Sequence, residues 1–193
     1  KYITQIAFSG AEEFIEKYPF CKSKTTTIYT YFNISNIANK SKEVTKGLFD
    51  KNKCNFLAMG RFNYQKGYDR LIDAFEKVHK LNDNAVLHII GKNDTDIGID
   101  IKRKIKTKSL SSCVKLYGII ANPFPYIRQC DAFISSSYYE GYPRVINEAL
   151  ALKKICIAPK VTGMDEALDN GNLGMLVDDS TEGLTKGMLD FLN

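Results

Sequence analysis

The sequence lacks several features that mark particular protein classes. Its five cysteines are odd in number, widely spaced and free of any C-x-x-C pair, which argues against a disulfide framework or a zinc site. We interpret them as small core residues in a reducing compartment, and we expect a cytoplasmic protein. No apolar run approaches the roughly 18–20 residues that a membrane-spanning helix requires. The chain begins with Lys1 and not with Met, so we expect it to be part of a longer protein.

The net charge is also small, and histidine is rare. The formal net charge is +5 and the lysines are scattered, whereas nucleic-acid-binding proteins usually carry a basic stripe with interleaved aromatic residues. We therefore expect no nucleic-acid partner. The weak basic bias is compatible with peripheral attachment of a longer parent protein to the inner face of the cell membrane. Both histidines, His79 at the end of a predicted helix and His88 inside a predicted strand, are interpreted as structural.

From residue 52 onward, short apolar runs alternate with longer segments of helical periodicity. Strands are predicted at 54–59, 85–90, 114–117, 132–135, 155–158 and 174–177, and helices at 66–80, 97–108, 125–129, 143–152, 165–169 and 181–192. Strands separated by helices form right-handed βαβ units and a parallel sheet. The pattern therefore predicts an α/β fold, a Rossmann-like doubly wound parallel sheet of about six strands, with ligands at the carboxyl ends of the strands.

The first 50 residues follow a different pattern. A strand is predicted at 1–8, ending in Ser9-Gly10, with a helix at 12–18, a strand at 26–31 and a polar helix at 34–46. We interpret this region as a short strand-helix-strand unit followed by a connector. The predicted division of the chain is 1–33 for the unit, 34–52 for the connector and 53–193 for the main domain, with the error of about 2–4 residues usual for such boundaries.

The first candidate site follows the strand at 54–59. Gly60 ends that strand, Arg61 follows at once, and Lys66 stands at the start of the next helix. The planar fork of an arginine and the mobile charge of a lysine together suit a diphosphate. The order does not match a Walker A motif, and a loop with two solvated cations is the other interpretation.

The second candidate site is YYEGYPRVINEAL, residues 138–150. Pro143 fits the first position of a helix, and the N–H groups of Arg144, Val145 and Ile146 would then lack partners within the helix and attract an anion. Glu140 would lie just before this helix and Glu148 one and a half turns into it. The spacing fits a nucleotide sugar, with a carboxylate at each end. A capped, solvated helix start is the alternative, and local geometry leaves both open.

Glu140-Gly141-Tyr142-Pro143 followed by Glu148-Ala149-Leu150 resembles the E-x7-E motif of retaining GT-B glycosyltransferases, particularly family 4, the glycosyl transferases group 1. Further segments are similar to this family in the same order. They are Gly60-Arg61, Lys66–Asp69, Leu71–Phe75, Leu87–Gly91, Tyr117-Gly118, Asn122–Ile127, Cys130–Ile134, Ser135–Ser137, Gly163 with Glu166, and Gly171 with Gly174–Val177. Two residues depart from the family pattern, since Asn147 stands where an aliphatic residue is usual and Arg144 adds a charge.

The resemblance implies a C-terminal, nucleotide-sugar-binding domain of a hexosyltransferase. Glu140 would contact the hydroxyls of the sugar, whereas Arg61 and Lys66 would hold the donor diphosphate and the charge that develops on the leaving group. Glu148 would bind the ribose. The other residues implied in nucleotide-sugar binding are Gly60, Gly91, Gly118, Ile119, Ile120, Gly141, Tyr142, Pro143, Arg144 and Val145.

The resemblance also implies the partners. The donor is expected to be an NDP-sugar, with UDP as the first expectation, and the acceptor a growing glycan or a lipid-linked saccharide. No metal or other cofactor is expected, because cationic side chains and a helix end would stabilise the diphosphate. Residues 1–33 look like the end of an acceptor-binding domain, so this chain alone is expected to be inactive. A GT-B type sugar-nucleotide epimerase and a non-catalytic nucleotide-binding or docking module are the alternatives.

Overall fold

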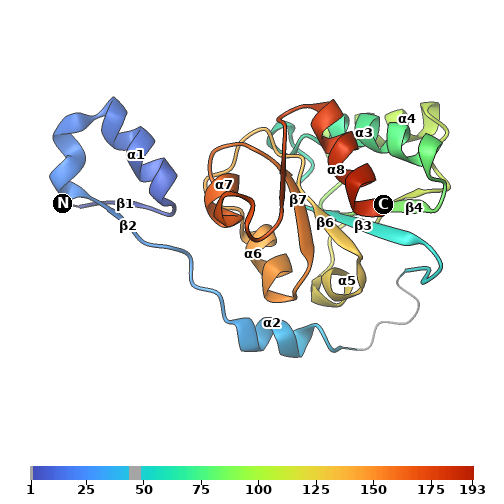
Figure 1. The fold of residues 1–193 in the computed structure, drawn as a ribbon, viewed down its shortest axis with the longest axis horizontal. Helices are drawn as coiled ribbons and strands as arrows, with labels where there is room; N and C mark the ends of the chain where they lie inside the picture. The colour runs from blue at the N-terminus through green and yellow to red at the C-terminus, as the bar shows by residue number, and fades with distance from the viewer. Residues whose placement is uncertain (1, 44–48) are drawn as a thin grey trace.

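The computed structural model of the chain describes residues 2–43 and 49–193. The main domain is built on one parallel sheet (Figure 1). Its strands are β3 (Cys54–Met59), β4 (Ala85–Ile90), β5 (Val114–Leu116), β6 (Ala132–Ile134), β7 (Ile155–Pro159) and β8 (Met175–Val177). Among the described residues they lie in the order β5-β4-β3-β6-β7-β8, and each neighbouring pair is parallel. The predicted doubly wound parallel sheet is confirmed.

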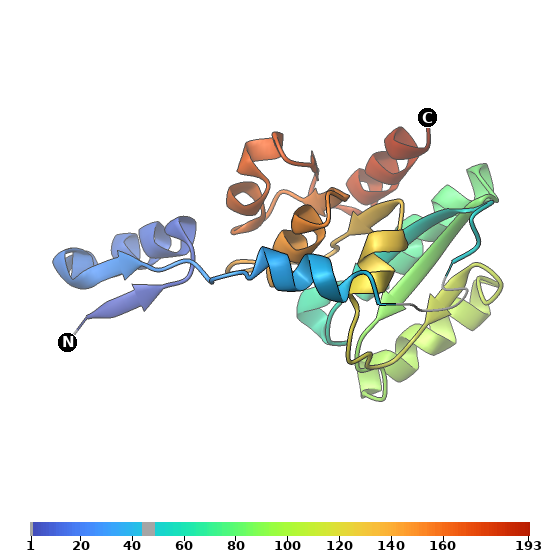
Figure 2. The ribbon, with the colours of Figure 1, turned by 90° about the horizontal axis from the view of Figure 1, so that it is seen from below.

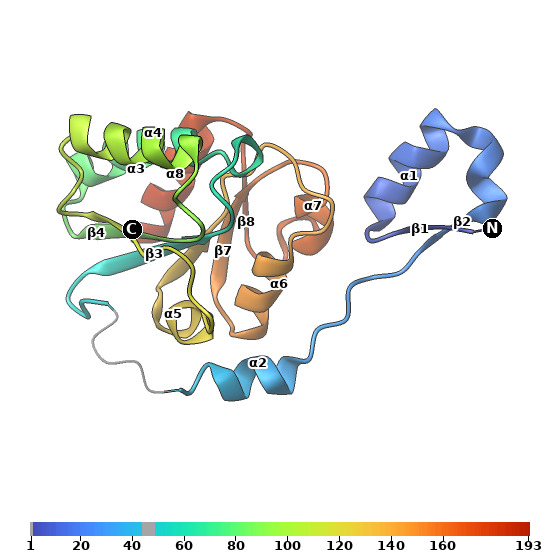
Figure 3. The same cartoon turned by 180° about the vertical axis from the view of Figure 1, so that it is seen from behind.

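Helices cover both faces of this sheet. On one face lie α3 (Tyr68–Leu81), α4 (Asp96–Thr107) and α8 (Thr181–Leu192), and on the other α5 (Phe124–Gln129) and α6 (Arg144–Ala151), as Figures 1 and 3 show. α2 (Ile34–Lys40) packs along the outside of α5 and α6 (Figure 2). Three short turns, η2 (Tyr64–Lys66), α7 (Met164–Ala167) and η3 (Asp169–Gly171), connect strands to the elements that follow. From residue 53 onward, each predicted element is present.

The central strand β3 divides the core into two layers. Phe56 faces α3, where it joins a buried cluster with Phe75. Leu57 points to the opposite face and packs in a second cluster with Ile127 of α5 and Ile146 of α6. All five side chains are fully buried. Burial on both faces explains why the strand is almost continuously apolar, which made it recognisable in the sequence.

The N-terminal unit contains β1 (Ile3–Gln5), α1 (Phe8–Lys17), the 3-10 helix η1 (Pro19–Lys24) and β2 (Thr25–Thr27). β1 and β2 pair in parallel, as the predicted strand-helix-strand unit requires. The predicted end of the first strand is wrong, because a distant carboxylate binds the N–H groups of Phe8 and Ser9 and the helix begins there. The second strand is shorter than predicted and η1 was not predicted.

The connector contains α2, which ends at Lys40, earlier than the predicted helix 34–46. Residues 44–46 of that prediction lie outside the described residues. α2 begins with a capped turn, because the side chain of Asn33 accepts a hydrogen bond from the N–H of Asn36 at 2.9 Å. The division at residues 33 and 52 stays a prediction.

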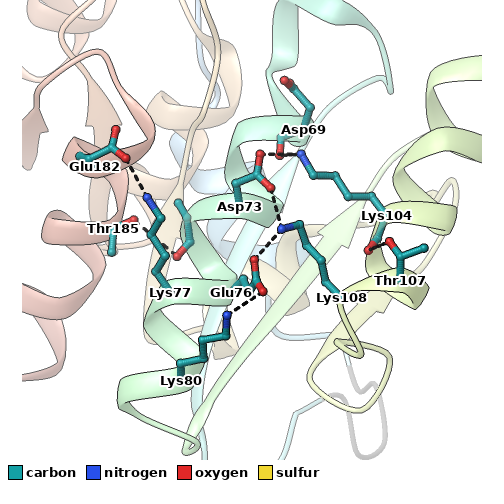
Figure 4. A network of polar contacts seen from close by, with 11 residues as sticks. Asp69, Asp73, Glu76, Lys77, Lys80, Lys104, Thr107, Lys108, Glu182 and Thr185 are labelled. Carbon is teal, nitrogen blue, oxygen red and sulfur yellow. Dashed lines mark hydrogen bonds and ion pairs between the residues drawn. The ribbon is translucent and has the colours of Figure 1, made fainter.

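A surface network of ion pairs joins α3 to the helices beside it (Figure 4). Lys108, the C-cap residue of α4, contacts both Asp73 and Glu76 of α3, and Lys77 of α3 pairs with Glu182 of α8. Hydrogen bonds from Lys108 and then from Lys80 lower the pKa of Glu76 to about 2. Because these groups are partly or largely exposed, the pairs contribute little to the free energy of unfolding, and the network orients helices that the apolar core already holds.

His88 is a buried polar residue in the middle of β4. Its Nε2 lies 3.0 Å from Oδ1 of Asn55, and its Nδ1 lies 2.9 Å from the hydroxyl of Tyr117. The amide nitrogen of Asn55 donates to the carbonyls of Asp50 and Lys53, so its Oδ1 is an acceptor. Nε2 of His88 therefore carries the proton and Nδ1 accepts one from Tyr117. The interpretation of His88 as structural agrees with this arrangement.

This network generates a pH dependence of stability. Burial, with a smaller contribution from Lys115, lowers the pKa of His88 to about 4, so between pH 6.5 and 4 only the unfolded chain gains a proton there. We expect the free energy of unfolding of the wild type to fall by roughly 2–3 kcal/mol more than that of His88→Gln as pH drops from 7 to 4.5. Denaturant unfolding at several pH values measures this difference. His79→Gln is the matched control and should keep the His88 contribution, and equal slopes for wild type and His88→Gln would contradict the assignment.

Candidate functional site

Three strands of the sheet end at glycines that touch one another. The N–H of Gly60 donates to the carbonyl of Ile90 at 3.0 Å, and the N–H of Gly91 donates to the carbonyl of Gly118 at 2.8 Å. A Cβ atom on Gly91 would lie 1.8 Å from the carbonyl oxygen of Gly60, so no side chain fits there. Three predicted site residues therefore form one bare backbone surface at the carboxyl ends of β3, β4 and β5, where doubly wound sheets bind ligands.

Glu140 and Lys66 are brought together at this edge of the sheet. Nζ of Lys66 lies 2.6 Å from Oε1 of Glu140, and the side chains are 19% and 9% exposed. The hydroxyl of Ser137 donates a second hydrogen bond to the same carboxylate oxygen, at 2.7 Å. Within the described residues, Oε2 of Glu140 accepts no hydrogen bond and remains available to a ligand. Two residues predicted from separate motifs thus form one ion pair.

The aliphatic part of the Lys66 side chain lies directly over Gly60. A Cβ on Gly60 would lie 2.9 Å from Cε of Lys66, and Gly60 has a φ of 154° that L side chains rarely adopt. The hydroxyl of Tyr68 donates to the carbonyl of Gly60 beside this contact, at 3.2 Å. Arg61, by contrast, is exposed, and the described residues give it no ion pair with Glu140 or Glu148. Joint action of Arg61 and Lys66 on a diphosphate stays a prediction.

The loop that carries Glu140 is joined residue by residue to the loop that carries Lys66. The N–H of Tyr138 donates to the carbonyl of Gln65, and the hydroxyl of Ser136 donates to the carbonyl of Lys66, each at 2.8 Å. A Cβ on Gly67 would lie 2.2 Å from the carbonyl oxygen of Ser136, so only glycine permits this approach. We call residues 64–67 and 135–140 the paired loops.

Arg70 of α3 holds the paired loops together, and the sequence analysis did not predict this role. Its Nε donates to the carbonyl of Ser136 at 2.8 Å and its Nη2 to the carbonyl of Ser137 at 2.6 Å. Nη1 pairs with Asp179 at 2.6 Å, and the guanidinium lies 4.0 Å from the centre of the Tyr138 ring. The side chain is only 7% exposed. The burial of Arg70 is visible only in the structure, where its three polar contacts supply the partners that a buried charge requires.

The start of α6 lies four residues after Glu140 and differs slightly from the prediction. Pro143 is the N-cap residue, and the helix begins at Arg144. The N–H of Ile146 donates to the carbonyl of Pro143 at 3.1 Å, so the prediction that it is unpartnered is wrong. The N–H groups of Arg144 and Val145 have no acceptor among the described residues. Two N–H groups and the positive end of the helix dipole remain for an anion.

Glu148 lies on the inner side of α6 with its side chain 14% exposed. Its nearest charged neighbour is Arg144, 3.9 Å away, and no described group donates a hydrogen bond to the carboxylate. Burial raises the pKa of Glu148, and Arg144 partly opposes this. A largely buried carboxylate without donors is costly, and the two hydroxyls of a ribose are donors of the kind it lacks.

The remaining predicted residues flank these groups. Gly141 is exposed, and a Cβ there would lie 3.4 Å from Cδ1 of Ile6 in the N-terminal unit. The hydroxyl of Tyr142 lies 3.4 Å from Oδ1 of Asn147, whose amide nitrogen donates to the carbonyl of Pro143. Asn147 therefore stabilises the loop before α6, which accounts for a polar residue at this helical position.

The segment after Gly118 divides between surface and core. The side chain of Ile119 is 75% exposed, whereas Ile120 packs against the core cluster beneath α5. Gly118 itself has a φ of 69° and no atom within 4 Å of a Cβ position, so it turns the chain where space is open. The structure supports an accessible edge at Ile119, and the predicted contact with a nucleobase stays a prediction.

The described residues contain no group of three or more His, Cys, Asp and Glu side chains arranged to hold a metal ion. In the same part of the chain, no helix combines the length and the apolar character needed to span a bilayer. What the site offers is a lysine paired with a carboxylate, a helix start with free N–H groups and a second, donor-poor carboxylate. Together they can bind an anion that carries hydroxyl-bearing groups on both sides.

The chain is similar in sequence to glycosyltransferases. It is 27% identical over 184 residues to the N-acetylgalactosamine-N,N'-diacetylbacillosaminyl-diphospho-undecaprenol 4-alpha-N-acetylgalactosaminyltransferase of Campylobacter jejuni, a match covering 94% of this chain and 48% of the relative. It is 32% identical over 127 residues to the capsular polysaccharide biosynthesis glycosyltransferase CapH of Staphylococcus aureus, covering 65% and 34%. The chain thus spans less than half the length of these two relatives.

The fold has solved counterparts. The crystal structure of HepE from Anabaena in complex with UDP and glucose superposes with a TM-score of 0.86 at 21% identity, over 100% of this chain and 53% of HepE. This likeness agrees with a GT-B glycosyltransferase fold for the chain. The family described as glycosyl transferases group 1 matches residues 53–193, the whole main domain. The chain belongs to the glycosyl transferases group 1 family.

Proposed function

We propose that the chain is the donor-binding domain of a retaining hexosyltransferase that transfers a sugar from a UDP-sugar to a growing glycan or a lipid-linked acceptor. The pairing of Lys66 with Glu140, four residues before a helix start with free N–H groups, carries this proposal. A cation and a helix N-terminus suit phosphate groups, whereas a carboxylate suits sugar hydroxyls. A sugar diphosphate presents both kinds of group at adjacent positions.

Donor binding would exchange the partners of Lys66 and Glu140. Without donor, the two side chains neutralise each other in a largely buried place, at an N–O distance of 2.6 Å. A bound diphosphate would take the ammonium group of Lys66, and sugar hydroxyls would take its place at the carboxylate. Before and after the exchange, each charged group would have a hydrogen-bond partner, which avoids the cost of an isolated buried ion.

The same residues would stabilise the departing nucleotide. When the bond between the anomeric carbon and the diphosphate oxygen breaks, negative charge grows on the diphosphate. Lys66, Arg61 and the N–H groups of Arg144 and Val145 would hold that charge, and the proposal requires no metal ion. Glu148 would bind the ribose, and the edge formed by Gly118–Ile120 would bind the base. Retention of anomeric configuration is proposed from the resemblance of Glu140 and Glu148 to the E-x7-E motif.

The acceptor is proposed from the named relatives. The Campylobacter jejuni relative carries a diphospho-undecaprenol-linked substrate in its name, and CapH is named for capsular polysaccharide. These names support a lipid-linked or growing glycan as the acceptor. We also propose that the parent enzyme works in the cytoplasm, at the inner face of the cell membrane. The chain spans only part of each relative, so we propose that residues 1–193 bind nucleotide and do not transfer sugar by themselves.

Removing the carboxylate of Glu148 tests nucleotide binding. We expect UDP to bind the wild type, and Glu148→Ala to weaken that binding by about 1–3 kcal/mol because the ribose hydroxyls lose their acceptor. Isothermal titration calorimetry with UDP, GDP and ADP measures both the effect and the preferred base. UDP is the first choice because HepE was crystallised with UDP.

Glu182→Ala is the matched control for this experiment, because Glu182 is an exposed glutamate of α8 with a side chain 74% accessible. It should leave the affinity for UDP unchanged. Binding of none of the three nucleotides to the wild type would reject the proposed function and favour a docking module. Equal affinities of the wild type and Glu148→Ala would reject the ribose contact alone.

A second prediction concerns Arg70. Lysine keeps the charge but cannot donate to the carbonyls of Ser136 and Ser137 while pairing with Asp179, so the paired loops should loosen. We expect Arg70→Lys to lower the free energy of unfolding by about 1–3 kcal/mol, since one carbonyl contact or more is lost in a buried place. Its affinity for UDP should also fall, because the loop that carries Lys66 is no longer held.

The measurements are denaturant unfolding and UDP calorimetry on the same preparations. Arg103→Lys is the control, because the side chain of Arg103 is 69% exposed and pairs with Asp100 on the surface of α4. It should change neither quantity. An Arg70→Lys variant with wild-type stability and UDP affinity would show that the arginine fork does not position the loops.

A further inference from the structure

Glu166 of α7 binds the start of α1 in the N-terminal unit. Its Oε1 accepts hydrogen bonds from the N–H of Phe8 at 2.9 Å and the hydroxyl of Tyr29 at 2.6 Å. Its Oε2 accepts from the N–H of Ser9 at 2.9 Å and the hydroxyl of Ser9 at 2.8 Å. The N-cap residue Ala7 has no side-chain acceptor, so the cap of α1 comes from the main domain. One carboxylate thus joins the two parts of the chain.

The charge of Glu166 matches what it binds. A helix N-terminus carries partial positive charge and attracts an anion. Burial alone would raise the pKa of Glu166, but hydrogen bonds from Tyr29, Ser9 and Phe8 outweigh it and keep the pKa below its ordinary value. The same contact raises the pKa of Tyr29 to about 12. The carboxylate is therefore ionised and satisfied when it binds α1.

α7 also rests on the loop that carries Glu140. Gly163, directly before α7, has a φ of 80°, and a Cβ there would lie 2.3 Å from the carbonyl oxygen of Gly141 and 2.9 Å from that of Glu140. Figures 1 and 3 show α7 on the side of the main domain that faces α1. The cap for α1 is therefore built on the same backbone that presents Glu140 and Gly141.

The N-terminal unit touches that loop directly as well. Ile6 lies over Gly141, at 3.4 Å from its Cβ position, and the rings of Tyr29 and Tyr142 are 5.5 Å apart between centroids. Tyr29 belongs to both contacts, since its hydroxyl binds Glu166 and its ring faces Tyr142. Docking of α1 on Glu166 and coverage of the loop at 141–142 are therefore one event.

We propose that Glu166 is a latch that docks the N-terminal unit on the main domain and sets Ile6 and Tyr29 over the donor loop. The four groups that donate to Glu166 all belong to Phe8, Ser9 and Tyr29. Removing this carboxylate therefore removes four hydrogen bonds between the N-terminal unit and the main domain. A second contact at the boundary, from the hydroxyl of Thr162 to Glu13 at 2.9 Å, is a single neutral-donor hydrogen bond. The consequence for the donor rests on the proposed function, whereas the docking itself does not.

Distance measurements between spin labels test the latch on the whole 193-residue chain. One label is placed at Glu16 on α1 and the other at Lys102 on α4, both exposed positions, with Cys21 and Cys54 replaced by serine. We expect one narrow distance distribution for the otherwise native chain. Glu166→Ala and Glu166→Gln should each add a second, longer population, because neither side chain offers two anionic oxygens to the four donors.

Asp165→Asn is the matched control, since it removes one negative charge from the same turn and should keep the narrow distribution. Thermal unfolding and UDP calorimetry on each variant establish that the main domain is folded. A broad distribution before mutation, a narrow one in Glu166→Ala, or equal broadening in Asp165→Asn would overturn the latch. Absence of UDP binding would reject the proposed function and leave the distance result standing.

Discussion

The candidate site depends on the joining of the paired loops through Arg70. Lys66 and Glu140 are 74 residues apart in sequence, and each stands on a loop that follows a different strand. The sheet brings the loops near one another, but the fork of Arg70 on the carbonyls of Ser136 and Ser137 fixes their relative position. Because a displacement of about 1 Å at a reacting group costs on the order of a hundredfold in rate, this buried contact is as important as the residues it positions.

The sequence predicted the sheet well because β3, β4 and β7 are buried on both faces and bounded by glycines such as Gly60 and Gly91. It also predicted that ligand-binding residues lie at the carboxyl ends of the strands, because that is where doubly wound sheets bind ligands. It did not predict Arg70, since the partners of that side chain are carbonyls, which every residue has. It also misplaced the start of α1, because the acceptor for Phe8 and Ser9 is Glu166, 157 or more residues away. Local patterns carry no information about such partners.

The two glutamates of the E-x7-E pattern are prepared differently for a ligand. Glu140 already has a cation and a hydroxyl on one oxygen, so a ligand must exchange with Lys66 to engage it fully. Glu148 is nearly as buried but has only Arg144 at 3.9 Å. One carboxylate is therefore held in place before binding, and the other is left short of donors. This difference fits two ends of one ligand and argues against an acid/base pair, whose members would face a single reacting atom.

The first N–H groups of α1 and of α6 have no acceptors within their own helices, and the described part of the protein provides an acceptor for only one of the two helix starts. The first N–H groups of α1 are satisfied by Glu166, which lies on the opposite part of the chain. Those of α6, at Arg144 and Val145, have no protein acceptor within the described residues, although Glu140 is only four residues ahead of Arg144. Lys66 and Ser137 both bind Oε1 of Glu140, and within the described residues neither N–H group donates to this carboxylate. That helix end is therefore left to an external anion.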